Sequence, residues 1–304
     1  MSAFRLFAFG PFEVLILVAK APPMDSLVFA VVLLAAAAHA GWNAAIKRGR
    51  DPLVTTVLIA LGAGAVSLPI LAAVGLPAAP ARPWVVASVI VHLGYFAGLI
   101  EAYRAGDMSQ VYPIARGSAP LLTALVSTAW LGERLGTLGW VGLLCLVAGV
   151  MMLSLRGGGD LTRLDRRAVG FALFTALTVC AYSVIDGVGV RASGDAIAYT
   201  AAVFLGNSVI MALYGVARRG AKPFAASSRI WATGFAGGAL QFASYGIALW
   251  AMTVAPIAVV AALRETSVLF GALIAVVVLR EPLRAPRVLA AVLIVAGLVM
   301  IKVH

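Results

Sequence analysis

The stretch YRAGDMSQVYPIARGSAPLLTALVSTAWLGERLGTLGWVGLLCLVAGVM at residues 103–151 has a counterpart, AMTVAPIAVVAALRETSVLFGALIAVVVLREPLRAPRVLAAVLIVAGLV, at residues 251–299. At a constant offset of 148, without a gap, the two stretches align Arg116 with Arg264, Glu133 with Glu281, and Ala148-Gly149 with Ala296-Gly297. An arginine inside a long apolar run is rare, so its recurrence at the same place indicates a duplicated unit. Internal repeats of hydrophobic segments are typical of transporters.

The composition indicates a protein that crosses a membrane several times. The 304 residues are 62% hydrophobic and 12% charged, far from the usage of soluble globular proteins. The net charge of +11 does not indicate a nucleic-acid partner, because the basic residues lie in short loops between apolar runs. The expected partners are the lipid bilayer and a small-molecule substrate, and nothing in the pattern specifies an oligomeric state.

The sequence predicts neither an enzyme nor a bound cofactor or metal. Cys145 and Cys180 lie inside apolar runs without metal-ligand spacing, which favours a role as small hydrophobic side chains. The chain has no Walker motif, HExxH pattern, nucleophile elbow or paired carboxylates. An integral-membrane enzyme and an ATP-driven pump are therefore weak alternatives.

Apolar runs of spanning length are separated by charged residues or by Gly and Pro. These runs must be helices, because an open sheet would leave backbone groups unsatisfied in lipid. Ten transmembrane helices are predicted, at about 27–46, 53–75, 84–104, 109–131, 137–155, 168–189, 196–216, 230–253, 256–279 and 285–302.

A polar linker, RGGGDLTRLDRR at 156–167, divides the spans into two sets of five. The expected fold is an all-α integral membrane protein with one five-helix repeat at 24–155 and a second at 168–304. Because five is odd, the second repeat enters the membrane from the opposite side, and the two repeats are inverted around a central cavity. Such repeats suit alternating access, although a channel shares the same symmetry.

Loop charges predict the orientation. Lys and Arg concentrate in loops on one face, at 47–50, 156–167, 218–229 and 280–287, whereas the face with both termini carries few. This distribution places both termini on the non-cytoplasmic side of a bacterial-type inner membrane. Residues 1–23 have only a short apolar stretch and are expected to be a leader or a disordered tail.

The repeated block resembles the EamA-type members of the drug/metabolite transporter superfamily, which include YddG-like exporters of amino acids. The matching stretches are SQVYPIARGSAPLLTALVSTAWLGERL at 109–135, VAALRETSVLFGALIAVVVLREPL at 260–283 and the opening HAGWNAAIK at 39–47. The resemblance implies ten spans, a central substrate cavity and export of small metabolites. Many members are thought to keep their termini in the cytoplasm, whereas the loop charges here favour the opposite.

Arg116 is a candidate for substrate binding. It lies well inside its span, and the nearby Pro113 and Pro120 predict a helix that is kinked or locally opened. A guanidinium suits a substrate carboxylate through a bidentate contact. The alternative, weighed about equally, is a structural ion pair, for which Glu101 is a possible partner.

Arg264 is the symmetry mate of Arg116, and Glu265 follows it directly. Neighbouring helical positions lie about 100° apart, so only one of the two is expected to face the cavity while the other reaches a neighbouring helix. Arg264 shares a helix face with Ser267, Val268 and Gly271, a stripe suited to a cavity wall or to close packing.

Aromatic and polar side chains at similar depth form a second group of candidates. An aromatic stripe is more often packing than a binding site, but polar tips at this depth need partners. Aromatic walls with a few polar groups suit an amino acid or an aromatic cation. The candidate residues are His92 and Tyr95 in the third span, Tyr182 with Ser183 in the sixth, Gln241 and Tyr245 in the eighth, and Trp42 and Asn43 in the first.

The remaining acids and His39 have other expected roles. Glu133 and Glu281 sit at span boundaries, which favours structural turns in which each carboxylate receives the amides of the next helix. Proton coupling would use His39, His92, Glu101 or Glu265, and exchange without ions is equally allowed.

The sequence therefore predicts a secondary transporter that exports amino acids, neutral or aromatic, or similar small metabolites. The alternatives within transport are a multidrug or cation carrier and a nucleotide-sugar-like carrier.

Overall fold

A computed structural model describes residues 5–9, 12–16, 24–48, 51–105, 108–154, 166–277 and 285–303. Over these residues the fold class is confirmed: the spans are helical, and each starts and ends within a few residues of its predicted bounds. The first half contains α1 (Ser26–Arg48), α2 (Pro52–Val74), α3 (Arg82–Ala105), α4 (Met108–Trp130) and α5 (Thr137–Ser154). The second half contains α6 (Arg166–Ser193), α7 (Ala196–Arg219), α8 (Ser228–Val254), α9 (Ile257–Arg264), α10 (Ser267–Val277) and α11 (Ala285–Val303).

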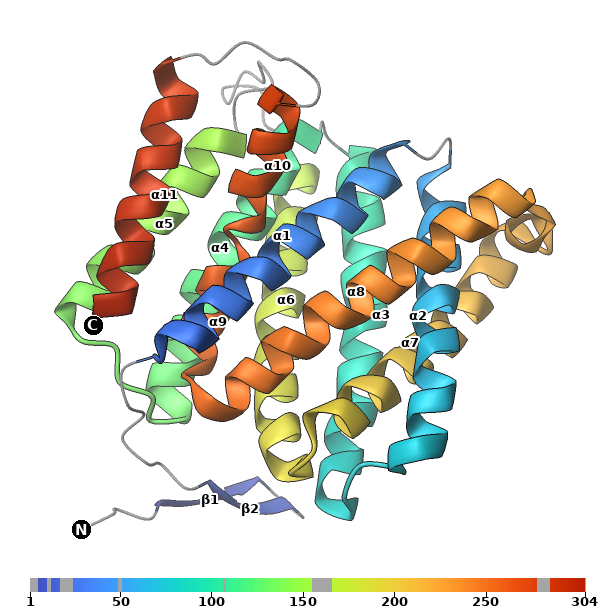
Figure 1. Ribbon diagram of the computed structural model, residues 1–304, viewed down its shortest axis with the longest axis horizontal. Helices are drawn as coiled ribbons and strands as arrows, with labels where there is room; N and C mark the ends of the chain where they lie inside the picture. Colours follow the sequence, from blue (N-terminus) through green and yellow to red (C-terminus); the bar gives the residue numbers. More distant parts are fainter. Residues whose placement is uncertain are drawn as a thin grey trace.

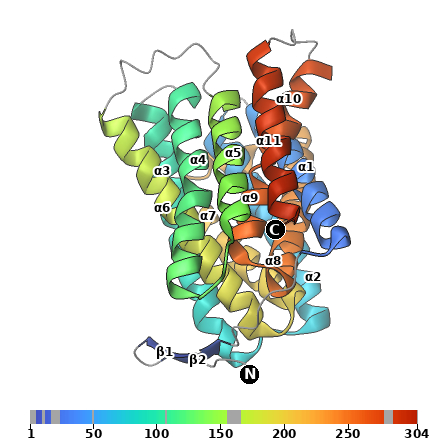
Figure 2. The same cartoon turned by 90° about the vertical axis from the view of Figure 1, so that its left-hand side faces the viewer.

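The packing follows the duplicated sequence. The offset of 148 matches α1 with α6, α2 with α7, α3 with α8, α4 with α9 and α10 together, and α5 with α11. The contacts come in matching pairs, because α1 packs on α8 as α3 packs on α6, and α4 packs on α6 as α1 packs on α9 and α10. Two further pairs, α2 with α7 and α5 with α11, join equivalent helices (Figures 1 and 2). This arrangement is that of two repeats related by a pseudo-two-fold axis.

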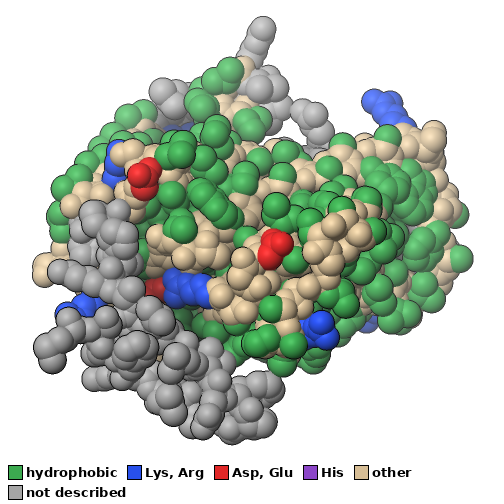
Figure 3. Space-filling model, turned by 60° about the horizontal axis from the view of Figure 1, so that its bottom comes forward, with side chains coloured by type: hydrophobic (Ala, Val, Ile, Leu, Met, Phe, Trp, Pro, Cys, Tyr) green, Lys and Arg blue, Asp and Glu red, His purple; other side chains and the backbone are tan. Residues whose placement is uncertain are grey.

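The outer surface suits lipid. Hydrophobic side chains cover most of the surface drawn in colour in Figure 3, and charged side chains are scattered on it. Large apolar residues are exposed along every long helix, among them Leu34, Ile90, Leu177 and Val299. Six of the described helical stretches qualify as membrane spans by length and composition alone. A helix that is apolar on all sides is expected where lipid replaces water.

The repeated Ala-Gly pair lies where α5 and α11 approach each other closely. A Cβ atom on Gly149 would lie 2.8 Å from the carbonyl oxygen of Ala290, and one on Gly142 would lie 2.8 Å from that of Gly297. Small residues at such crossings let two membrane helices approach backbone to backbone. The conspicuous glycine of the repeat is therefore a packing residue.

Gly149→Leu is expected to destabilise the protein by about 1–3 kcal/mol, because α5 and α11 would have to separate. The matched control is Gly271→Leu on α10, where an added Cβ meets no atom within 4 Å. The midpoint of thermal unfolding in detergent measures both variants. Equal midpoints for the two would contradict the close packing.

Two features of the fold were not anticipated. Strands β1 (Arg5–Phe9) and β2 (Phe12–Ile16) pair as an antiparallel hairpin, with Phe9 opposite Phe12, inside the stretch expected to be a leader or disordered tail.

The second feature is a pair of matching helix caps. Asp51 caps α2 and Asp195 caps α7, each accepting two backbone N–H groups of the first turn at 2.8–3.3 Å. Equivalent helices in the two halves thus begin in the same way.

Candidate functional site

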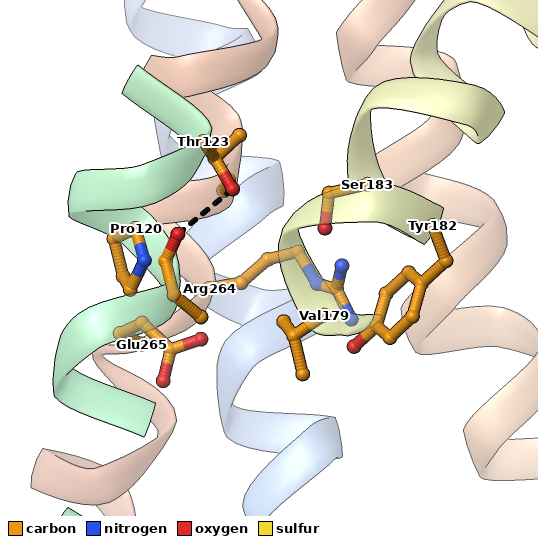
Figure 4. A pocket seen from close by; sticks show the side chains of 9 residues that line it. Pro120, Thr123, Val179, Tyr182, Ser183, Arg264 and Glu265 are labelled. Atoms are coloured by element: carbon orange, nitrogen blue, oxygen red, sulfur yellow. Dashed lines mark hydrogen bonds between the residues drawn. The ribbon is translucent and has the colours of Figure 1, made fainter. Parts of the chain in front are cut away.

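A small cavity lies at the centre of the molecule between α4, α6 and the end of α9 (Figure 4). The free space it encloses, about 10 Å³, corresponds to about one water molecule. Its walls are Ala119, Pro120 and Thr123 of α4, Val179, Tyr182 and Ser183 of α6, and Ala261, Arg264 and Glu265. The space is too small for anything larger than a water molecule, so a larger solute enters only after the helices move apart.

The ninth span is interrupted at the cavity. α9 ends at Arg264 and α10 begins at Ser267. Between them the amide of Glu265 donates to Ala262 O at 3.0 Å and that of Thr266 donates to Leu263 O at 3.1 Å. Bonds to the third preceding residue make a tight 3₁₀-type turn, which in mid-helix often marks a functional hinge. In the fourth span, where a kink or a local opening was expected, α4 runs uninterrupted from Met108 to Trp130, so the helix is not opened there.

The turn explains why both charged neighbours line the cavity, where only one was expected to. Arg264 extends toward Tyr182 and Ser183 of α6, whereas Glu265 lies on the side of Pro120 in α4 (Figure 4). In an α-helix, neighbouring side chains lie about 100° apart. In the 3₁₀-type turn after α9 they lie about 120° apart, and the two side chains face opposite walls of one cavity. One short segment thus supplies a cation and an anion.

Arg116 is half of a buried ion pair. Its Nε lies 2.9 Å from Oε2 of Glu265, and the two side chains are only 7% and 5% exposed. Nη2 of Arg116 also lies 3.5 Å from Nε2 of His39. Glu101, named above as a possible partner, lies 3.8 Å from Arg218. The pair joins α4 of the first half to the interrupted span of the second.

Arg264 is in a different situation. Its guanidinium carbon lies 4.6 Å from the centre of the Tyr245 ring, a cation–π contact. Among the described residues no carboxylate forms an ion pair with it. Of the two arginines that the repeat aligns, Arg116 is therefore neutralised by a neighbouring acid, and Arg264 remains open to an anion in the cavity.

Aromatic rings from three helices form a cluster beside Arg264. The His92 ring of α3 stacks on Tyr182 of α6 at 4.3 Å, and Tyr95 meets Tyr182 edge to face at 5.7 Å. Tyr245 of α8 lies 6.3 Å from Tyr182. Nδ1 of His92 donates to Ser88 O at 2.9 Å, since a carbonyl only accepts. The structure thus brings His92, Tyr95, Tyr182 and Tyr245 together.

The sequence reasoning missed Asp186. This residue of α6 is fully buried, and its carboxylate accepts hydrogen bonds from the hydroxyl groups of Tyr199, at 3.0 Å, and Tyr245. The available signal was a lone acid in the apolar run CAYSVIDGVGV at 180–190. An ionisable residue inside a span is a functional candidate by default.

Glu133 binds a helix start, but not that of the next helix, α5. Its carboxylate accepts from the amides of Ile257, at 2.8 Å, and Ala258, at 3.3 Å, at the beginning of α9. Nη2 of Arg191 lies 3.0 Å from Oε1 of Glu133, and Arg191 also donates to the carbonyls of Met252 and Ala255. We call this set of contacts the Glu133 latch. It joins the α4–α5 turn of the first half to α6 and the α8–α9 turn of the second.

The other predicted residues lie around this centre. Trp42 packs edge to face on His39 at 4.9 Å, and its indole nitrogen has no partner among the described residues. Ser267 is buried at the start of α10, and Gln241 is half-buried in α8. The Asn43 side chain and Glu281 lie outside the described residues. Within the described part of the chain, no three His, Cys, Asp or Glu side chains form a metal site.

Comparison with known proteins decides the family. The model of the EamA-like transporter family matches residues 26–155 and again residues 166–303. This chain belongs to the EamA-like transporter family. The two matches coincide with the two halves of the structure, which confirms the resemblance seen in the repeated block.

Curated relatives match one part of this EamA-like transporter. The spermidine export protein MdtI of Enterobacter sp. (strain 638) is 34% identical over 68 residues, which are 22% of this chain and 62% of that protein. MdtI of Yersinia pestis (strain Pestoides F) is 32% identical over 77 residues, 24% of this chain and 69% of that protein. A solved crystal structure superposes with a TM-score of 0.72 at 20% identity, over 94% of this chain and 99% of the other, and shows the same fold.

The family and the geometry together describe a multi-pass membrane transporter. The centre holds a small cavity lined by Glu265, which pairs with Arg116, and by Arg264, for which the described residues supply no ion-pair partner.

Proposed function

We propose that this protein is a secondary transporter that exports amino acids, neutral or aromatic, or similar small carboxylated metabolites by alternating access. The observation that carries the proposal is Arg264, a cation inside the membrane that lines the cavity without an ion-pair partner among the described residues. A charged side chain at this depth in the membrane costs free energy, so its presence favours a functional role. A planar guanidinium matches a carboxylate in a bidentate contact.

The other walls suit the rest of an amino acid. Glu265 faces the same cavity and offers a carboxylate to a substrate ammonium group. Thr123 and Ser183 add hydroxyl groups, and Tyr182 adds an aromatic face. A few placed polar groups on a largely apolar wall are typical of small-molecule sites.

Flux measurements on purified protein test the proposal. Proteoliposomes loaded with labelled leucine or phenylalanine should release the label faster than liposomes without protein, and external unlabelled leucine should speed the release by exchange. Leucinamide, which lacks the carboxylate, is the matched control and should compete poorly. If no amino acid leaves or exchanges, the substrate assignment is wrong.

A polyamine or other organic cation is the second candidate. Its support is the similarity to the spermidine export protein MdtI over 68–77 residues. Two acids, Asp186 and Glu265, and the rings of Tyr182 and Tyr245 lie at the centre and would favour a cation. Release of labelled spermidine that leucine does not inhibit would favour this candidate.

Alternating access requires contacts between the halves that form on one face and break when that face opens. The Glu133 latch is such a contact. It lies on the face where α1 begins and α11 ends, and it connects the first half to the start of α9. The carboxylate is nearly buried, at 9% exposed, so each charge-assisted bond is worth about 1.5–3 kcal/mol.

Glu133→Gln is expected to open the cavity toward the latch face about tenfold more often, because the charge on the α9 amides and Arg191 is lost. A Ser183→Cys reporter in a background without Cys145 and Cys180 measures this as the rate of labelling by an impermeant maleimide. Glu101→Gln, which alters an acid on the opposite face, is the control. Unchanged labelling from the latch face in Glu133→Gln would show that the latch is not a gate.

We also propose that the chain lies in a bacterial-type inner membrane with both termini on the non-cytoplasmic side, as the loop charges predict. In intact cells, a cysteine at Thr137 near the latch should react with an impermeant reagent, and one at Arg219 should not. Both side chains are exposed. The reverse labelling pattern would place the termini in the cytoplasm.

A further inference from the structure

We propose that Asp186 is a positioning residue for substrate recognition, because it holds the Arg264 guanidinium, through Tyr245, where a substrate carboxylate binds. The proposal rests on the function proposed above. It assigns a role to Asp186, which among the described residues is the one fully buried acid outside the cavity walls.

The contacts form a continuous path. Asp186 of α6 accepts the hydroxyl hydrogen of Tyr245 from α8, and the ring of Tyr245 carries Arg264 of α9 at 4.6 Å from its centre. Arg264 then lines the cavity. Residues of three helices, α6, α8 and α9, thus meet in one chain of contacts that ends at the proposed anion site.

The path constrains Arg264 in two ways. The hydrogen bond to Asp186 fixes the Tyr245 ring, which Phe204 and His92 also border edge to face at 5.7 and 6.1 Å. A phenol that donates to a carboxylate also gains electron density, which strengthens the attraction of its ring for a cation. The guanidinium is therefore held over the ring in an orientation that leaves its N–H groups available to the cavity.

Asp186 has a second tyrosine that is not on this path. Tyr199 of α7 donates to the other carboxylate oxygen at 3.0 Å and is fully buried. Its hydroxyl packs on Gly189, where any Cβ would collide with it. Tyr199→Phe therefore removes a hydrogen bond of the same kind from the same carboxylate without touching the Tyr245–Arg264 contact.

The test compares Tyr245→Phe, Asp186→Asn and Tyr199→Phe with the wild type. The first readout is the preference for leucine over leucinamide in counterflow, which reports recognition of the carboxylate. Tyr245→Phe and Asp186→Asn should lower this preference about tenfold, the value of the hydrogen bond to a charged group that fixes the Tyr245 ring. Tyr199→Phe should retain it, although the variant is less stable.

The second readout needs no substrate. Phenylglyoxal modifies arginine, and peptide mass spectrometry gives the ratio of modified Arg264 to modified Arg116. Tyr245→Phe and Asp186→Asn should raise this ratio several-fold, because a ring that is no longer hydrogen-bonded to Asp186 holds the guanidinium less firmly, whereas Tyr199→Phe should not. If the wild type transports no amino acid but the ratios change as stated, the proposed substrate fails and the positioning role stands.

Equal effects of Tyr199→Phe and Tyr245→Phe in both readouts would overturn the proposal, because Asp186 would then be a general structural anchor. Unchanged selectivity and unchanged modification in Tyr245→Phe would also overturn it. That variant keeps the ring and loses only the hydroxyl group, so the test does not depend on whether Asp186→Asn folds.

Discussion

Arg116→Ala is expected to destabilise the protein by about 3–5 kcal/mol, because it leaves the buried carboxylate of Glu265 without its partner. The Nε–Oε2 distance is 2.9 Å and both side chains are less than one-tenth exposed, so water cannot replace the guanidinium. The loss should appear as a large fall in the thermal unfolding midpoint in detergent and in a low yield of folded protein.

The double variant Arg116→Met with Glu265→Leu separates the buried charge from the packing. Replacing both partners of a buried pair with apolar residues of similar volume is often neutral, so most of the lost stability should return. Arg218→Ala is the control, since its pair with Glu101 is about one-third exposed and is worth less than about 1 kcal/mol. If Arg116→Ala is as mild as Arg218→Ala, the pair is not a buried structural element.

The architecture was predictable because it depends on local signals. Apolar runs, Gly and Pro punctuation and the constant offset determine where spans lie and that the halves are inverted. The predicted span 137–155 and the helix Thr137–Ser154 differ by a single residue. The orientation and the domain boundaries stay predictions.

The interior of the ninth span was not predictable by the same means. The run AALRETSVLF at 261–270 contains neither Pro nor Gly, yet the helix is interrupted at Glu265 and Thr266. The hydroxyl of Thr266 donates to Leu263 O at 2.7 Å and supports the turn. In α4 the opposite holds, because Pro113 and Pro120 lie inside one continuous helix. Neighbouring helices satisfy the backbone groups that a membrane proline frees.

Hydrogen-bond partners that are distant in the sequence could not be predicted from local sequence patterns. An acid after a helix suggests a cap, but the sequence does not say that Glu133 caps α9 of the other half. Asp186 was different, since the rule that selected Arg116 selects any charge in an apolar run. Applying that rule to every acid would have found Asp186, while its tyrosine partners required the structure.

Arg264→Gln is expected to reduce transport of carboxylated substrates by about 10- to 150-fold with little change in stability. The reduction corresponds to the loss of a charged hydrogen-bond contact of about 1.5–3 kcal/mol. Stability should change little, because no acid among the described residues depends on Arg264 for an ion pair. Initial rates of leucine counterflow and the unfolding midpoint, measured on the same preparation, check both statements.

Arg264→Lys is the matched control, since it keeps the charge and removes the planar fork. It should retain part of the leucine transport but lose discrimination against leucinamide. Wild-type leucine transport in Arg264→Gln would show that the cation does not bind the carboxylate. Faster spermidine release in that variant would instead favour the cation carrier, because an arginine at the site repels a polyamine. The two repeated arginines thus predict opposite phenotypes: loss of Arg116 destabilises the protein, and loss of Arg264 leaves a stable protein that recognises its substrate poorly.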